Sequence, residues 1–217
     1  MYIPPSFAAD EDQVRRLFDE CPVADLVTVT AEGLLASFLP VLYDPAAGHP
    51  AAGERGSVLG HLARANPQWH APVEGEALVI LHGHNAYVSP SWYPSKAEHG
   101  RVVPTWDYAV AHVYGRLVVH DDPVWLEALV RRLTDRHEAG RRPQWSVDDA
   151  PAPYISGQLK AIVGVEVVIS RVEAKAKWSQ NRPEADVEGV MAGLEASGQG
   201  AAAAEVGEAR RARVARG

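Results

Sequence analysis

Hydrophobic and polar residues alternate along most of the chain, as they do in strands with one buried face. The longest alternating run extends from Trp106 to His120 and predicts one long strand. Shorter runs predict strands over residues 24–30, 34–43, 57–61, 76–82, 85–89 and 162–172. Because residues 85–89 continue the preceding pattern after Gly83, the total is six or seven strands. So many strands with only peripheral helices favour a mainly β (α+β) fold built on an antiparallel barrel.

Helical periodicity is confined to short segments between and after these strands. Asp10 and Gln13 have the spacing of a capping box, so a helix is expected to begin there and to end before Pro22. Asp122 followed by Pro123 predicts the start of a second helix. Residues 183–196 predict a third helix, and residues 62–66 a brief helical turn closed by Pro67. The tail over residues 197–217 offers little to bury and is expected to be disordered.

Composition narrows the class of protein. The chain has 217 residues, of which 47% are hydrophobic and 23% charged, as in an ordinary globular domain. A net charge of −7 disfavours direct DNA binding, which normally requires a basic surface. The single cysteine, Cys21, excludes an internal disulfide and suggests a reducing compartment. No apolar run has the length of a membrane span, so we expect a cytoplasmic protein without a membrane partner.

Aromatic residues crowd the segment from residue 85 to residue 115, where prolines 90, 94 and 104 oppose helix formation. Trp92, Tyr93, Trp106 and Tyr108 supply the rings. The polar groups between them are Ser91, Ser95, Lys96 and Thr105. A wide apolar wall with a few fixed polar groups suits a flat cofactor or an aromatic ligand. A buried loop anchored by aromatic side chains is the alternative interpretation.

Several histidines lie on predicted strands, namely His61, His82, His84 and His112. Haem iron needs only one axial side chain in an otherwise apolar site, so such histidines are candidate ligands. The alternative is that each is an ordinary hydrogen-bonded residue. No histidine, cysteine and carboxylate cluster has zinc-like spacing, and no dinucleotide-binding glycine motif or Gly-x-Ser-x-Gly elbow is present.

Five short motifs, at residues 60–69, 86–96, 103–108, 112–115 and 179–182, resemble those of the PaiB family, whose members are often labelled FMN-binding negative transcriptional regulators. The resemblance implies a split β-barrel of the flavin-reductase/pyridoxamine-oxidase kind over residues 1–196. It also implies a homodimer with a cofactor between the protomers.

One PaiB-like branch comprises haem-dependent piperazate synthases, which close N5-hydroxyornithine into a cyclic hydrazine. For this chain the branch implies haem b, an amino-acid-like substrate and intramolecular N–N bond formation. His61 is the first candidate for the axial ligand, with His112 and His84 as alternatives. The candidate catalytic residues are Asp107, Lys96 and Tyr93. The candidate cofactor-binding residues are Arg64, Ser91, Trp92, Trp106 and Arg182.

The resemblance leaves two other functions open: an FMN protein acting as an oxidoreductase, and a regulator without catalysis. In the FMN protein, Arg64, Ser91, Ser95 and Lys96 would bind the phosphate. The sequence departs from the usual pattern at His84-Asn85, at Asp107, where asparagine is usual, and at Trp178. A carboxylate at position 107 suits an amino-acid substrate, because it can pair with the ammonium group.

Overall fold

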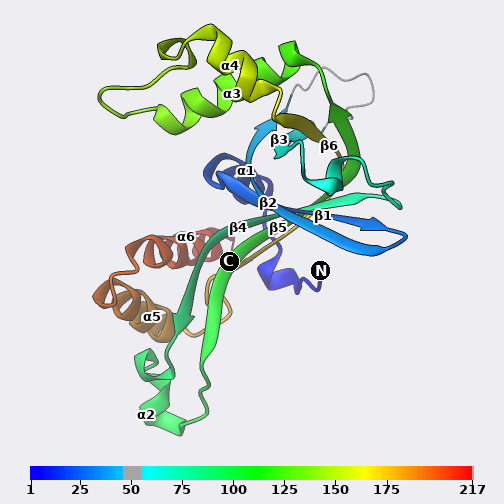
Figure 1. Cartoon of the computed structure of the whole chain (residues 1–217). Helices are drawn as coiled ribbons and strands as arrows, with labels where there is room; N and C mark the ends of the chain where they lie inside the picture. The colour runs from blue at the N-terminus through cyan, green and yellow to red at the C-terminus, as the bar shows by residue number, and fades with distance from the viewer. Residues whose placement is uncertain (46–54, 217) are drawn as a thin grey trace. The chain divides into compact units, whose positions relative to one another are not determined.

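The computed structural model describes residues 1–45 and 55–216 (Figure 1). The strands are β1 (Val23–Thr30), β2 (Gly33–Asp44), β3 (Ser57–Ala63), β4 (Ala77–Val88), β5 (Thr105–His120) and β6 (Ile162–Lys177). The α-helices are α1 (Glu11–Glu20), α2 (Ser95–His99), α3 (Pro123–Glu138), α4 (Ala152–Leu159), α5 (Glu184–Ala196) and α6 (Gly200–Arg216). Short 3-10 helices are η1 (Pro5–Phe7), η2 (Pro67–Trp69), η3 (Pro90–Trp92) and η4 (Val147–Asp149).

The six strands form a closed barrel in the order β1-β2-β3-β6-β5-β4. β1 and β2 are antiparallel neighbours, with Val23 opposite Pro40 and Thr30 opposite Gly33. β3 and β6 pair in the same antiparallel sense, with Ser57 opposite Val168. The predicted antiparallel, mainly β fold is therefore confirmed.

Contacts divide the chain into two compact units. The first unit comprises Met1–Leu17, His82–Ala111 and Ala174–Gly217, and the second comprises Phe18–Leu81 and His112–Glu173. Strands β4, β5 and β6 each contribute residues to both units. The single domain expected over residues 1–196 stays a prediction.

The second unit contains the backbone pairings of β1 with β2, β2 with β3 and β3 with β6, and a small hydrophobic cluster that packs α3 against β2 and β3. Leu129 and Leu133 of α3 contact Leu42 of β2 and Leu59 of β3 in this cluster. Asp122 accepts hydrogen bonds from the Val124 and Trp125 backbone N–H groups, which confirms the predicted N-cap of α3.

The first unit is built around buried aromatic and small residues from three separate parts of the chain. Val88 of β4, Trp178 and Val190 of α5 share one cluster, and α6 packs against α5 beside it (Figure 1). The α6 residues in the cluster are Ala202, Ala203, Val206 and Ala209.

The expected disorder of the tail is wrong for residues 200–216, which form α6. The expectation treated alanine as offering little to bury. Alanine is, however, the strongest helix former, and its small side chain allows helices to approach closely. Arg210 of α6 also pairs with Glu184 and Glu188 of α5, which adds polar contacts to the exposed side of the same interface.

Local predictions were mostly confirmed. Asp10 and Gln13 form the reciprocal capping box at the start of α1, which ends at Glu20. The helical turn over residues 62–66 is wrong, since β3 continues to Ala63 and η2 begins at Pro67. Residues 76–82 and 85–89 belong to one strand, β4. Most of the loop expected over residues 44–56 lies outside the described residues.

Among the described helices, none combines the length and the apolar character that crossing a membrane requires.

Candidate functional site

The aromatic segment lies in the first unit, where Trp92 of η3 packs against α5. A Cβ atom at Gly193 would lie 2.2 Å from the Trp92 ring, and one at Gly189 would lie 2.0 Å from the Trp92 carbonyl oxygen. Because both positions are glycine, the helix backbone can approach the ring. Trp92 is half-buried by this contact, so only part of its surface remains for a ligand.

Tyr93 is buried beside a cation. Its side chain is 2% exposed, and its hydroxyl group has no hydrogen-bond partner among the described residues. The Arg182 guanidinium carbon lies 4.8 Å from the centre of the ring, within cation–π range. Burial raises the pKa of the Tyr93 phenol, and the Arg182 charge opposes that rise. The phenol is therefore neutral, and its ring packs against the Arg182 guanidinium.

Two polar residues of the segment are exposed and adjacent. Lys96 Nζ donates to Ser91 Oγ at 3.3 Å, and within residues 1–45 and 55–216 Lys96 forms no ion pair. An unpaired ammonium beside a hydroxyl group is a suitable partner for a phosphate. Ser95, by contrast, is buried and donates from both its backbone N–H and its hydroxyl to Asp186.

The second tryptophan of the segment is open to solvent. Trp106 of β5 is 54% exposed, and its ring lies edge-on to Tyr87 of β4 with the centroids 6.1 Å apart. Two exposed aromatic side chains on neighbouring strands form an apolar surface that a flat ring or another protein chain can cover.

Asp107 follows Trp106 and points to the opposite side of β5. It has no exposed surface. One carboxylate oxygen accepts from Lys177 Nζ at 3.1 Å, and the other accepts from Ser179 Oγ at 2.7 Å. Burial raises the pKa of Asp107, while the bonds from Ser179 and Lys177 oppose this shift. The predicted substrate contact of Asp107 stays untested, and the carboxylate already serves two protein partners.

Arg64 lies in the second unit, apart in the chain from the aromatic segment. Its guanidinium pairs with Asp121, with an N–O distance of 2.5 Å, and donates to the Lys160 and Ile162 carbonyl oxygens. The Asp121 hydrogen bond raises the pKa of the Arg64 guanidinium. The structure gives Arg64 a local partner, and its cofactor role stays a prediction.

Among the candidate iron ligands, His61 of β3 has the most distinctive environment. Burial lowers the pKa of its imidazole, and Nδ1 is buried without a hydrogen-bond partner in the described part of the chain. The neutral imidazole is the form that binds metals. His112 of β5 lies edge-on to Tyr114, with the ring centroids 6.4 Å apart.

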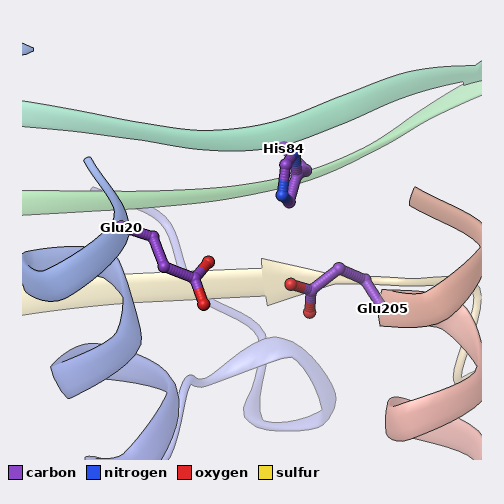
Figure 2. Close-up of side chains that lie close together, drawn as sticks. All are labelled: Glu20, His84 and Glu205. Carbon is purple, nitrogen blue, oxygen red and sulfur yellow. The ribbon is translucent and has the colours of Figure 1, made fainter. Parts of the chain in front are cut away.

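His84, the third candidate, is exposed on β4. Figure 2 shows it with Glu205 of α6, and the ligand atoms of these two residues lie within 4.8 Å of each other. Glu205 also pairs with Arg16 of α1 at 3.9 Å. Glu20, drawn in the same view, belongs to the second unit, so of these three residues only His84 and Glu205 are candidate ligands within the first unit. Two side chains are too few to define a metal site.

Sequence reasoning missed three residues that surround the candidate site. Lys177 at the end of β6 pairs with Asp107, Ser179 donates to the same carboxylate, and Arg213 of α6 donates to the Gln180 and Arg182 carbonyl oxygens. Ser179 lies in a motif that signalled its importance. Lys177 carried no signal, and Arg213 lay in the tail that was expected to be disordered.

The chain resembles known proteins over most of its length. The model of the family described as "Putative FMN-binding domain" matches residues 1–171. An uncharacterized protein of Emericella nidulans is 30% identical over 213 residues, which cover 84% of this chain and 85% of that protein. The protease synthase and sporulation protein PAI 2 of Bacillus subtilis is 29% identical, with coverages of 90% and 89%.

Solved structures share the fold at low sequence identity. A conserved hypothetical protein of Mycobacterium tuberculosis matches with a TM-score of 0.57 and 11% identity, over 85% of this chain and 95% of that one. An FAD and heme binding protein of Mycobacterium smegmatis matches with a TM-score of 0.52 and 19% identity, over 79% and 73%. These matches concern the fold alone, which is the split barrel of the flavin-reductase/pyridoxamine-oxidase kind.

Proposed function

Since this chain belongs to the family described as "Putative FMN-binding domain", we propose that it is an FMN-binding protein whose first unit holds the flavin. The observation that carries the proposal is the exposed Lys96–Ser91 pair on the aromatic segment. Its ammonium has no acidic partner among the described residues, so a phosphate can occupy it without breaking an ion pair. Arg182 is a second cation without an ion pair in the described residues.

These residues fit the parts of the cofactor. Lys96 and Ser91 would bind the phosphate, and the exposed face of Trp106 would cover the isoalloxazine ring. Arg182 would contribute positive charge near the anionic parts of the flavin. When bound, FMN supplies hydride and electron transfer, so the activity proposed is that of an oxidoreductase. Covering the ring with Trp106 would exclude water from one of its faces.

A comparison of FMN with riboflavin tests the phosphate contact, because the two ligands differ only in that group. We expect the protein to bind FMN more tightly than riboflavin. Lys96→Met should weaken FMN binding by about tenfold, the loss of one charge-assisted contact, and leave riboflavin binding unchanged. Lys160→Met is the matched control, since it removes an exposed lysine of the second unit. Equal affinities for the two ligands in the unmodified protein would refute the proposed site.

We also propose that the protein acts as a homodimer, as the resemblance implies. Tyr87, Val103 and Trp106 are exposed hydrophobic residues of the first unit, and such groups commonly mark an interface. Light scattering after size-exclusion chromatography measures the mass directly. Trp106→Glu should shift the mass toward that of a 23.5 kDa monomer, whereas a monomer in the unmodified protein would contradict the proposal.

His61 favours a second candidate function, in which the protein binds haem b and closes N5-hydroxyornithine to piperazate. The lowered pKa keeps the imidazole neutral, and its buried Nδ1 has no partner in the described residues, which fits a metal ligand. Bound haem would supply Lewis-acid activation of the hydroxylamine. Family membership supports FMN over haem.

Absorbance separates the two candidates. Protein produced with a haem supply should show flavin absorbance and no Soret band near ~400 nm if the FMN proposal holds. A Soret band that His61→Ala abolishes would favour the haem enzyme. If the protein retains FMN but reduces no electron acceptor, the result would instead favour the regulator without catalysis that the family label implies.

A further inference from the structure

The buried carboxylate of Asp107 makes contacts that suit a role other than the substrate contact expected from sequence. Its Oδ1 accepts from Lys177 Nζ, and its Oδ2 accepts from Ser179 Oγ. Lys177 Nζ also donates to Thr105 Oγ1 at 2.9 Å and to the Trp106 carbonyl oxygen at 2.5 Å. Asp107 has no exposed surface, and both of its carboxylate oxygens are bonded to protein groups.

Ser179 has an unusual backbone conformation. Its φ is +57°, and among the described non-glycine residues it alone has a positive φ. A residue with a Cβ atom rarely adopts this region unless its surroundings fix it there. The hydrogen bond from its hydroxyl group to Asp107 is one such constraint, and it joins β5 to a residue just beyond the end of β6.

Ser179 in turn begins the tight turn that carries Arg182. The Arg182 backbone N–H donates to the Ser179 carbonyl oxygen at 2.9 Å. Gln180 ties the same turn to the strand end, since its side chain accepts from the Trp178 N–H and donates to the Ala176 carbonyl oxygen. From α6, Arg213 donates to the Arg182 carbonyl oxygen at 2.8 Å.

We propose that Asp107 is a positioning residue, which holds Ser179 in its left-handed conformation and thereby fixes Arg182 over Tyr93 for contact with the cofactor. The last step, contact with the cofactor, rests on the proposed FMN function. The earlier steps are contacts within the first unit, running from Asp107 through Ser179 and the turn to Arg182. Asp107 acts through Arg182 and does not touch the flavin.

Hydrogen–deuterium exchange tests the positioning without any cofactor. Asp107→Asn and Ser179→Ala should each speed amide exchange in peptides covering residues 178–182 severalfold, because the constraint on the turn is lost. Glu166→Gln is the matched control: it alters another buried carboxylate that is bonded to a serine and a basic residue, but in the second unit. Unchanged exchange at residues 178–182 in both first-unit variants would overturn the inference.

Ligand binding tests the consequence for the cofactor. Arg182→Gln and Ser179→Ala should each reduce the preference for FMN over riboflavin, and the double variant should lose no more than Arg182→Gln alone. A merely structural role would instead lower both affinities together and add to the loss in the double variant, which would also overturn the inference. If the unmodified protein binds no FMN while exchange responds as expected, the proposed function fails and the positioning of Arg182 stands.

Discussion

Each unit buries one carboxylate between a serine and a basic residue, and the two carboxylates stabilise different parts of the backbone. In the second unit, Glu166 of β6 accepts from Ser57 Oγ at 2.6 Å and contacts His120 Nε2 at 2.7 Å. Ser57 and Glu166 lie on strands that are also paired through their backbones. In the first unit, Asp107 bonds to Ser179, which lies beyond the end of β6.

The difference lies in what else holds the bonded segments. Between β3 and β6 the backbone ladder remains if the side-chain bonds are lost, so Glu166 reinforces a structure that exists without it. Ser179 lies beyond the end of β6 and outside the strands, and it adopts a strained conformation. The same chemistry therefore supports a strand pair in one unit and fixes a turn in the other, and that turn presents Arg182, a candidate cofactor-binding residue.

The largest expected effect comes from removing the cation beside Asp107. Lys177→Met leaves a buried carboxylate without its ion-pair partner, which should lower the free energy of unfolding by about 3 kcal/mol. His120→Gln keeps a donor for Glu166 and should cost only about 1 kcal/mol. Urea denaturation measures both. Equal losses would mean that the two carboxylates contribute equally to stability and that Asp107 has no special role in the first unit.

Helix glycines give a second, smaller contrast between the units. Gly193→Ala in α5 would push a methyl group into the Trp92 ring and should cost about 1–3 kcal/mol. Gly157→Ala in α4 meets nothing within 4 Å and should instead stabilise by about 0.5–1 kcal/mol through helix propensity. Thermal melting measures both shifts. A harmless Gly193→Ala would show that Trp92 can move away from α5.

The two units also differ in how far the sequence predicted them. In the second unit, alternation and an N-cap at Asp122 are local signals, and they predicted the strands and α3 because each element is determined mainly by its own residues. The first unit gathers segments far apart in the chain. The Asp107–Lys177 ion pair joins two of these segments. The residues next to Asp107 in the sequence indicate neither that the pair forms nor that the carboxylate is buried.

The same limit applies to the candidate site. The aromatic segment was recognisable by composition, and Ser91 and Lys96 are exposed as a polar site requires. Arg64 was grouped with them by residue type; its partners Asp121, Lys160 and Ile162 belong to the second unit, and its cofactor role stays a prediction. Helix α6 was missed because its alanines are buried only when α5 is present to receive them.

Acidification should reveal the smallest and most specific contrast, since burial shifts the pKa values of His61 and Asp107 in opposite directions. The pKa of His61 is lowered, so its contribution to stability is present above about pH 6.5, the value in the unfolded chain, and is lost as the pH falls through the native value. The pKa of Asp107 is raised, so its contribution is present below the unfolded value and is lost as the pH rises through the native one.

Melting temperatures between pH 7.5 and pH 5 of the unmodified protein and two variants separate these contributions. His61→Gln should reduce the fall in melting temperature on acidification, because the unfolded chain no longer gains a proton at this position that the native state resists. Asp107→Asn should make the fall steeper, because it removes a native group that binds a proton readily. Exposed His137→Gln serves as the control for removing a histidine. Parallel pH profiles for His61→Gln and the control would show that the His61 imidazole takes up a proton freely, which would remove the reason for preferring it over His84 and His112 as a ligand.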